Sequence, residues 1–582
     1  MWTYTAPLRD MRFVIEEVLR APEAWSGMPA FAELDGMTSG QILEEAGKFA
    51  SDVLAPINGA ADLQGCTWSD GRVTTPAGYV EAYRAYIEGG WSALACAPAF
   101  GGQGLPMLLN AAFNEMIVAA NHGWTMYPGL LHGAYECLAT HGSEALKERY
   151  LPNIVSGRWL ATMNLTEPQA GSDLGLVRTK AEPGPDGSWL IHGSKIFISG
   201  GEHDLTENIV HLVLCRLPEA PPGSKGLSLL LAPKFLPDGS RNAIRCDGIE
   251  KKMGIKGSAT CAMSFEGAVA WLVGEPHRGL AAMFVMMNSA RLHVGLQGLG
   301  HLDMAQQNAH AYTHERVQGR GLAIARHAAV RRKLWELRAL VEGERVIAYW
   351  TAHLLDESHH HPDPERRRRA NDLVSVLTPM VKAFFTDNGH NGANQALQLW
   401  GGYGYIHEYG IEQTVRDSRI AMVYEGTNEI QAIDLLQRKV LDDGGLRLEL
   451  LLATIEDAAA RSAPEPRLAD FVTALREQVD LVRMATRELI AGRPGDPEWA
   501  QSIASDFLRG LGFALLAWAW ALTARSLPTE GGDEWQRDKL LAARFGIQWL
   551  LPEGQLCWRR VRTAEARVPP AAQQSAGASE GG

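Results

Sequence analysis

The spacing of hydrophobic residues divides the chain into stretches of two kinds. Apolar residues recur at helical intervals from Ser39 to Ser156, which is typical of amphipathic helices. Between Trp159 and Val273 they gather in short runs rich in β-branched residues, separated by Gly, Pro and Asp, as in antiparallel sheets. Helical spacing returns at Gly279 and continues almost to the end of the chain. The pattern predicts an α+β protein whose β domain lies between helical regions.

The same pattern suggests where the segments begin and end. We expect an N-terminal extension (1–38), a helical N-terminal domain (39–158), a middle antiparallel β domain (159–275), a helical C-terminal domain (276–440), an appended helical domain (441–568) and a disordered tail (569–582). The stretch Leu109–Thr140 is expected to be helical throughout. The runs expected to form strands are Val177–Ala181, Trp189–Ile191, Lys195–Ser199, Ile209–Cys215, Leu227–Ala232 and Ala262–Glu266.

Composition and charge narrow the functional classes. The 582 residues carry 55 basic and 67 acidic side chains, and this net charge of −12 argues against a nucleic-acid or anionic-membrane partner. The 7 cysteines form no CxxC pair, so we expect reduced thiols in a cytoplasmic protein. The N-terminus has charges where a signal peptide would be apolar. The longest apolar run, Leu511–Ala524, falls short of the roughly 18 residues of a membrane span and is expected to be a buried helix; a helix lying on a membrane is the alternative.

The stretch Ile420–Arg438 carries the strongest candidate for chemistry. We expect an extended lead-in, a turn at Gly426 and a helix capped by Thr427 or Asn428. Glu425 would then lie on the turn, where apolar burial raises a carboxylate's pKa and a helix N-terminus lowers it. A base that works near neutral pH requires burial to dominate. The helix should bury the side that carries Ile430, Ile433, Leu435 and Leu436.

Two further stretches can approach a large ligand. In Met163–Leu174, small residues such as Gly171 and Ser172 let backbone N–H groups approach an anion, and Thr166 offers a hydroxyl. On the helix that follows Gly279, Asn288 and Arg291 lie three residues apart and therefore share one face. Taken without other information, this pair is more typical of a solvated helix face than of a binding site.

Several of these segments together resemble the acyl-CoA dehydrogenase family. The similar segments, which extend over most of the region from Phe100 to Val440, are YEGTNEIQ (424–431), TEPQAGSD (166–173), KIFISGG (195–201) and QLWGG (398–402). The resemblance implies a helical N-terminal domain, a middle β domain and a four-helix-bundle C-terminal domain. The N-terminal extension and the appended helical domain resemble those of a long-form branch of that family.

The resemblance also assigns roles to residues. It implies that Glu425 is the catalytic base and that the cofactor is FAD. The implied FAD-binding residues are Met163, Leu165, Thr166, Gly171, Ser172, Phe197, Ser199, Arg316, Gln398, Gly401, Gly402, Thr427 and Glu429. The implied substrate-binding residues are Ser172, Asn288, Arg291, Tyr424 and Gly426. Phe197 and Ser199 stand where Trp and Thr are frequent in the family.

The implied reaction is the α,β-dehydrogenation of an acyl-CoA thioester to the trans-2-enoyl-CoA. Glu425 would remove the α-proton, its backbone N–H would stabilise the developing enolate, and the flavin would accept the β-hydride. The long-form resemblance suggests a short or medium acyl chain, with 3-methylthiopropionyl-CoA as a candidate and Met126, Tyr127 and Met163 as candidate pocket residues. It further implies a homodimer and an electron-transfer flavoprotein as the electron acceptor.

Alternatives remain open at this point. An acyl-CoA oxidase would pass the electrons to oxygen instead. A DNA-associated alkylation-response flavoprotein would need a basic face on the appended domain, where only Arg559, Arg560 and Arg562 cluster. No GxGxxG fingerprint follows an expected strand, which argues against a Rossmann site. The adjacent histidines His359–His361 precede prolines and are expected to lie in a solvated loop, so no metal site is expected.

Overall fold

The computed structural model describes residues 2–319, 321–492 and 497–563, apart from the side chains of residues 285, 287–289, 492, 497 and 563. The expected tail 569–582 lies outside these residues. The helices are α1 Leu8–Arg12, α2 Ala21–Ser26, α3 Gly36–Lys48, α4 Ala55–Gln64, α5 Tyr79–Glu88, α6 Met107–Thr125, α7 Leu131–His141, α8 Glu144–Val155, α9 Gly279–Glu315, α10 Ala328–His360, α11 Pro364–Trp400, α12 Ile411–Ser418, α13 Asn428–Ile433, α14 Leu446–Ser462, α15 Ala469–Gly492, α16 Pro497–Ser526, α17 Glu534–Phe545 and α18 Leu551–Thr563.

The middle of the chain forms the β domain that the sequence predicts. A hairpin of β1 (Thr67–Ser69) and β2 (Arg72–Thr74) lies outside it. The main sheet has the order β3-β6-β4-β5-β9-β7, β8 pairs with β9, and β6 also pairs with β7, so the pairing returns on itself. Its strands are β3 Trp159–Asn164, β4 Lys180–Pro183, β5 Trp189–Ser199, β6 Asn208–Arg216, β7 Leu227–Pro233, β8 Ile244–Ile249 and β9 Thr260–Val273.

The sheet differs from the sequence prediction in three respects. β3 and β8 were not expected, and the two runs expected around Gly193 form the single strand β5. β3 runs parallel to β6, whereas most other pairs are antiparallel. A parallel pair requires a long crossover, which is available here because β4 and β5 lie between the two strands in the sequence.

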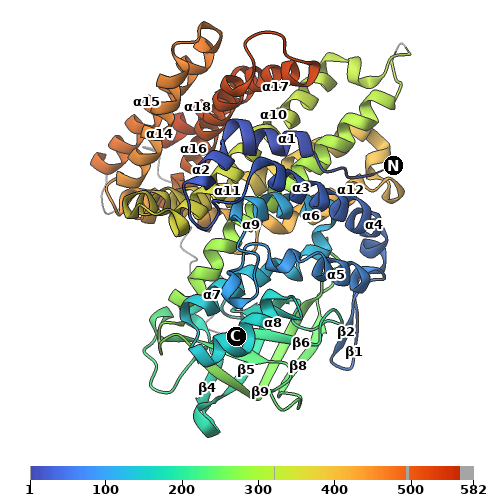
Figure 1. Cartoon of the computed structure of the whole chain (residues 1–582), viewed down its shortest axis with the longest axis vertical. Coiled ribbons are helices and arrows are strands. Elements are labelled where there is room, and N and C mark those ends of the chain that lie inside the picture. The colour runs from blue at the N-terminus through green and yellow to red at the C-terminus, as the bar shows by residue number, and fades with distance from the viewer. Residues whose placement is uncertain (1, 320, 493–496, 564–582) are drawn as a thin grey trace, which may run out of the picture.

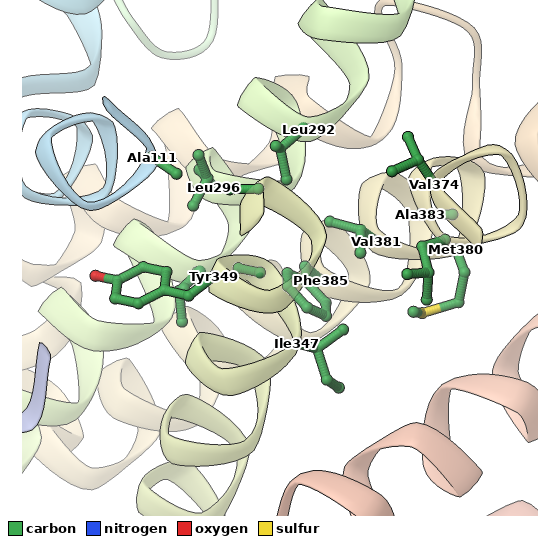
Figure 2. Packing of buried hydrophobic residues seen from close by; sticks show 14 of the residues in the cluster. Ala111, Leu292, Leu296, Ile347, Tyr349, Val374, Met380, Val381, Ala383 and Phe385 are labelled. Atoms are coloured by element: carbon green, nitrogen blue, oxygen red, sulfur yellow. The ribbon is translucent and has the colours of Figure 1, made fainter. Parts of the chain in front are cut away.

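Three long helices, α9, α10 and α11, form the core of the C-terminal domain. Figure 2 shows side chains from α6, α9, α10 and α11 packed together, among them Ala111, Leu296, Ile347 and Phe385. The backbones of α9 and α11 touch where they cross, since a Cβ at Gly298 would lie 2.4 Å from the Phe385 carbonyl oxygen. The absence of a side chain at Gly298 therefore allows the two helices to pack closely at this crossing.

The expected helix Leu109–Thr140 is broken into α6 and α7. Asn121 leaves helical geometry inside α6 (φ −162°, ψ 84°), and its side-chain oxygen accepts a hydrogen bond from the Trp124 N–H at 3.0 Å. A short 3₁₀ turn that begins at Pro128 then separates the two helices. An Asn side chain that bonds to a nearby backbone group competes with helical hydrogen bonding, which accounts for the break.

The appended domain lies at the opposite end of the molecule from the sheet, where Figure 1 shows α14, α15, α17 and α18. Within the described ranges, one helix, Glu498–Ser526, is long and apolar enough to cross a membrane, with a mean hydropathy of 1.4 over its best window. However, 94% of that window is buried inside the protein. A helix buried on all sides, as expected for Leu511–Ala524, accounts for this composition.

The N-terminal extension packs against the appended domain. The Phe13 and Trp535 rings meet edge to face at 5.4 Å, and the Arg9 guanidinium lies 4.1 Å from the centre of the Trp535 ring. Lys539 of α17 pairs with Asp10 at 2.5 Å. The two segments that suggested the long-form branch are thus in contact with each other (Figure 1).

Candidate active site

The turn before α13 has a strained backbone. Glu425 adopts φ +55° and Gly426 φ +83°, both in the left-handed region that side chains other than Gly rarely enter. Thr427 caps α13 by accepting a hydrogen bond from the Ile430 N–H at 3.4 Å. A left-handed non-glycine residue that is held in place by its surroundings is a feature of functional turns.

Two details of this stretch differ from the sequence prediction. The lead-in is a 3₁₀ turn at Arg419–Met422 rather than extended chain. Ile430 is 41% exposed, although Leu435 and Leu436 are fully buried as expected. The first turn of α13 is covered by the protein interior on another side, since its buried residues are Asn428, Gln431 and Ala432, and Ile430 lies outside that buried face.

Helix α11 holds the turn through buried polar groups. The Lys382 ammonium donates to the Gly426 carbonyl oxygen at 2.8 Å and to Asn428 Oδ1 at 2.9 Å. Asn428 in turn donates to Thr386 Oγ1 at 3.0 Å and to Asp387 Oδ1 at 2.7 Å. These contacts fix the turn against a long helix rather than leaving it on a free loop.

The Glu425 carboxyl group has the protonation behaviour of a base. Burial raises its pKa to about 7, although the positive charges of Lys382 and Arg291 oppose this effect. Burial therefore outweighs these two positive charges, as a base near neutral pH requires. The Glu425 carbonyl oxygen accepts from Gln431 Nε2 at 2.9 Å, while its N–H has no hydrogen-bond acceptor among the described residues. That N–H is free to donate to a ligand oxygen.

Tyr424 connects the turn to a buried polar network. Its hydroxyl donates to Gln297 Oε1, and His122 Nε2 lies 3.2 Å from the Tyr424 hydroxyl oxygen. Because the Tyr424 O–H is already used, His122 Nε2 is the donor and its Nδ1 accepts from His301 Nε2 at 2.9 Å. Burial lowers the pKa of both histidines, so the network is uncharged. The break in α6 at Asn121 places His122 in this position.

Arg291 points to the same region as Glu425 from α9. Its Nη1 donates to Asp434 Oδ2 at 3.0 Å, and both side chains are less than a tenth exposed. The Nε of Arg291 is buried and has no hydrogen-bond partner among the side chains and backbone groups that the structure describes. The Asn288 side chain, predicted to bind substrate, lies outside the described residues.

The loop after β3 is held by a second buried lysine. The Lys195 ammonium donates to the Leu165 carbonyl oxygen at 2.9 Å and pairs with Glu167 at 2.8 Å. Burial opposes ionisation of Glu167, but Lys195 and the hydrogen bonds from Arg178 and Thr179 lower its pKa to about 2. Leu165 is buried, Met163 and Thr166 are half-buried, and Gly171 and Ser172 are exposed. These five residues, all predicted to bind the flavin, therefore follow one another from the end of β3 into the loop that Lys195 holds.

Phe197 projects from the sheet next to this loop. It has φ +60°, lies at the register shift between Lys195 and Ile198 in the β5–β9 pairing, and is 59% exposed. Ser199 is half-buried at the end of the same strand. A bulge that turns an aromatic ring outwards gives a flat surface on which another ring can stack.

A separate pocket collects other predicted cofactor residues. Its volume is about 500 Å³, and its lining includes Arg316, Gly401 and Gly402. The Arg316 guanidinium lies 5.0 Å from the centre of the Tyr403 ring. A Cβ added to either glycine would meet no atom within 4 Å, so both backbones face open space. Gln398 is exposed beside the pocket. Thr427 is half-buried and Glu429 is exposed, but both lie at the Glu425 turn, and none of the described residues of that turn lines the pocket.

One cluster has the composition of a metal site. Among the described residues, Asp62, His407 and Glu412 bring one donor atom each within 4.8 Å of one another. The Arg416 guanidinium hydrogen-bonds both carboxylates, at 2.6 Å to Asp62 and 2.8 Å to Glu412. The carboxylates are thus neutralised by an arginine.

Family models match four parts of the chain. They are the N-terminal domain (38–158), the middle domain (162–268) and the C-terminal domain (277–440) of acyl-CoA dehydrogenases, and an acetyl-CoA dehydrogenase C-terminal-like domain (451–568). The chain belongs to the acyl-CoA dehydrogenase family. It is 39% identical to a 3-methylmercaptopropionyl-CoA dehydrogenase of Ruegeria pomeroyi over 95% of this chain and 96% of that protein. The long-form branch suggested by the sequence is therefore confirmed.

A second relative supports the family, and a solved structure shares the fold. A butyryl-CoA dehydrogenase of Syntrophomonas wolfei is 33% identical over 94% of this chain and 95% of its own length. An acyl-CoA dehydrogenase of Bacillus anthracis, solved in complex with FAD, matches with a TM-score of 0.75 and 21% identity over 92% of this chain and 90% of that one. Together with the family membership of the chain, this shows that the acyl-CoA dehydrogenase is FAD-dependent. The outward ring of Phe197 and the open backbones of Gly171, Gly401 and Gly402 fit a long cofactor with a flat ring and phosphates.

Some residues of the site were not found from the sequence. Lys382, Gln431, His122 and Gln297 all hold the turn or its tyrosine, and none was singled out. Lys382 had a signal, because it is the single charge within the apolar run Met380–Phe385. A charge in such a run is buried only when polar groups receive it.

Proposed function

We propose that Glu425 is the base of this acyl-CoA dehydrogenase and removes the α-proton of the bound thioester. The observation that carries the proposal is the Glu425 turn, which combines a carboxyl pKa of about 7 with a backbone N–H that is free to donate. That N–H would stabilise the negative charge that develops on the thioester oxygen, and the shape of the turn keeps it accessible. FAD, when bound, supplies the acceptor for the β-hydride. The loop 163–172, Phe197 and Ser199 would hold its ring.

For the substrate, we propose a short acyl-CoA, with 3-methylthiopropionyl-CoA as the first candidate. The name of the Ruegeria relative and its 39% identity support this choice. Met126 Sδ lies 3.6 Å from the Tyr424 hydroxyl, which places a thioether beside the base. A small cavity of about 50 Å³ between α6, α7 and α9 is lined by Gly129 and His293, among others. Tyr127 does not fit its expected pocket role, because its hydroxyl is buried against Ala259 and Gly257.

The test is anaerobic mixing of the purified yellow protein with a panel of acyl-CoAs, followed by flavin absorbance. We expect rapid bleaching by 3-methylthiopropionyl-CoA, lost in Glu425→Gln with the flavin retained. Glu477→Gln, an exposed glutamate of the appended domain, is the matched control and should bleach like the wild type. If no thioester bleaches a protein that holds FAD, the assignment of Glu425 is wrong. If butyryl- or hexanoyl-CoA reacts far faster, the thioether substrate is wrong.

The assembly and partners are part of the same proposal. The open pocket around Arg316 and Gly401 supports a homodimer in which a second chain completes the binding of the nucleotide half of FAD, and Tyr405 beside it is 85% exposed. Sedimentation equilibrium should give twice the chain mass. We further propose a cytoplasmic location and an electron-transfer flavoprotein as acceptor. Reoxidation of the bleached enzyme by that flavoprotein, but not by oxygen, would separate a dehydrogenase from an oxidase.

The DNA-associated alternative finds no support in the appended domain. Arg560 pairs with Asp506 at 3.2 Å, and Arg562 pairs with Glu488 at 2.9 Å. Arginines that are neutralised by acidic residues of neighbouring helices do not form the basic face that duplex DNA requires.

A further inference from the structure

Lys382 is a buried cation without a carboxylate partner. Its side chain is fully buried in α11, and among the described residues no carboxylate oxygen lies within 4.0 Å of its ammonium. Both of its hydrogen-bond partners, the Gly426 carbonyl oxygen and Asn428 Oδ1, are neutral oxygens of the catalytic turn. A buried cation is costly unless it is neutralised or strongly hydrogen-bonded, so its retention here calls for a reason beyond packing.

The contact with Gly426 fixes the geometry of the base. The backbone of Glu425 is left-handed. Its carbonyl oxygen accepts a hydrogen bond from the Gln431 side chain, and the carbonyl oxygen of Gly426 accepts one from Lys382. Fixing both carbonyls fixes the direction of the Glu425 side chain and of its free N–H. Lys382 also presents its charge to the Glu425 carboxyl group from within the protein interior, where screening by water is weak.

Other charged groups lie near Glu425 and Lys382, and their charges are compensated to different degrees. Arg291 on α9 is neutralised by Asp434 at 3.0 Å. Asp387 on α11 and the exposed Glu429 on α13 add negative charge near Lys382. Lys382 is therefore the cation whose charge is least compensated by a direct ion pair in this region.

We propose that Lys382 is a positioning residue for Glu425: it holds the left-handed turn through the Gly426 carbonyl and sets, by its charge, the pH range in which Glu425 acts as a base. This inference rests on the proposed role of Glu425. It predicts that Lys382 acts on the ionisation of the base without touching the substrate. Burial lowers the pKa of Lys382 itself to about 8, so the lysine is a cation at pH 7.

The experiment compares Lys382→Gln, which keeps a hydrogen-bonding group but loses the charge, with Lys382→Arg, which keeps the charge. The rate of flavin bleaching by a saturating acyl-CoA is measured from pH 5.5 to 9. The charge of Lys382 lowers the pKa of Glu425, so its loss in Lys382→Gln should move the acid limb up, by about one pH unit. Lys382→Arg should keep the wild-type midpoint with a lower kcat, because its larger head group cannot reproduce the contact with Gly426. KM should change little in both variants.

A second readout does not require turnover. Glu425 carries a raised pKa in the folded protein, so its ionisation destabilises the fold as pH rises from the unfolded value of 4.5 towards 7. Glu425→Gln should therefore raise Tm at pH 8, and it should raise Tm more in the Lys382→Gln background than in the wild type. FAD content and Tm of each variant are recorded as controls.

The outcomes separate the two proposals. If the wild type is not bleached by any acyl-CoA, the role of Glu425 fails. If the wild type is bleached but Lys382→Gln keeps the wild-type midpoint, or Lys382→Arg shifts it as far as Lys382→Gln would, the role of Lys382 is overturned. Should Lys382→Gln not fold, a Lys382→Arg midpoint that moves by about one pH unit would still overturn the proposal, and additive Tm changes in the remaining variants would do the same. Additive Tm changes in the double variant would also contradict the proposal.

Discussion

Two buried lysines hold the two loops of the active site, and they differ in how their charge is compensated. Lys195 holds the loop after β3, where its charge is compensated by the Glu167 carboxylate at 2.8 Å. Lys382 holds the Glu425 turn through neutral oxygens only. Both lysines are fully buried. The comparison shows that a buried lysine can fix a loop through an ion pair, or can keep an uncompensated charge that acts on a neighbouring base.

The ion pair of Lys195 should contribute more to the free energy of unfolding than the contacts of Lys382. Lys195→Met leaves Glu167 buried and unpaired, and breaking a buried pair in this way costs about 3–5 kcal/mol of unfolding free energy. Chemical denaturation with the flavin signal and with tryptophan fluorescence measures this loss. The double variant Lys195→Met/Glu167→Gln removes the orphaned charge and should recover part of it. A loss below about 1 kcal/mol in the single variant would show that the pair is not closed.

Gly426→Ala tests the other loop at its backbone. Gly426 has φ +83°, and a Cβ there would lie 2.7 Å from Gln431 Nε2, which holds the Glu425 carbonyl. Displacement of the base by a fraction of an ångström to one ångström lowers turnover by roughly 100-fold. The rate of flavin bleaching under anaerobic conditions measures it. Gly444→Ala, also left-handed (φ +66°) but with no atom within 4 Å, is the matched control for backbone strain and should keep the wild-type rate.

How far these features could be read from the sequence depends on their range. Glu425, Gly426 and the cap Thr427 lie within three consecutive residues, so a local motif was sufficient to predict the turn. The contact between Lys382 and Gly426 spans 44 residues, and no local pattern records which loop a distant helix residue meets. Neither β3 nor its parallel direction was predicted, for a related reason: the direction depends on the distant strand β6 with which β3 pairs.

The pH response should distinguish the two loops without any mutation. Glu425 has a pKa of about 7, so kcat/KM of the free enzyme should fall as pH is lowered through 7, by about tenfold per unit below it. Glu167 has its pKa lowered to about 2, and the stability it contributes is present above its unfolded value of 4.5 and is lost only below it. The retention of FAD and the stability contributed by the loop after β3 should therefore stay constant from pH 5 to 8, while activity changes over the same range. A rate that stays constant between pH 5.5 and 8 would contradict the assignment of Glu425.

The smallest effect is expected where an ion pair is exposed. Arg9 of the N-terminal extension pairs with Asp533 before α17, and both side chains are about half exposed. Water and salt screen such a pair, so Arg9→Ala should lower Tm by less than about 2 °C, part of it through lost packing on Trp535. Differential scanning calorimetry at low and high salt measures the change, and Arg9→Lys, which keeps the charge, serves as the control. A decrease as large as that of Lys195→Met would mean that exposure is not what separates weak from strong pairs in this protein. Burial would then no longer explain why the pair of Lys195 with Glu167 is expected to be strong, and the charge on each partner would have to be measured directly.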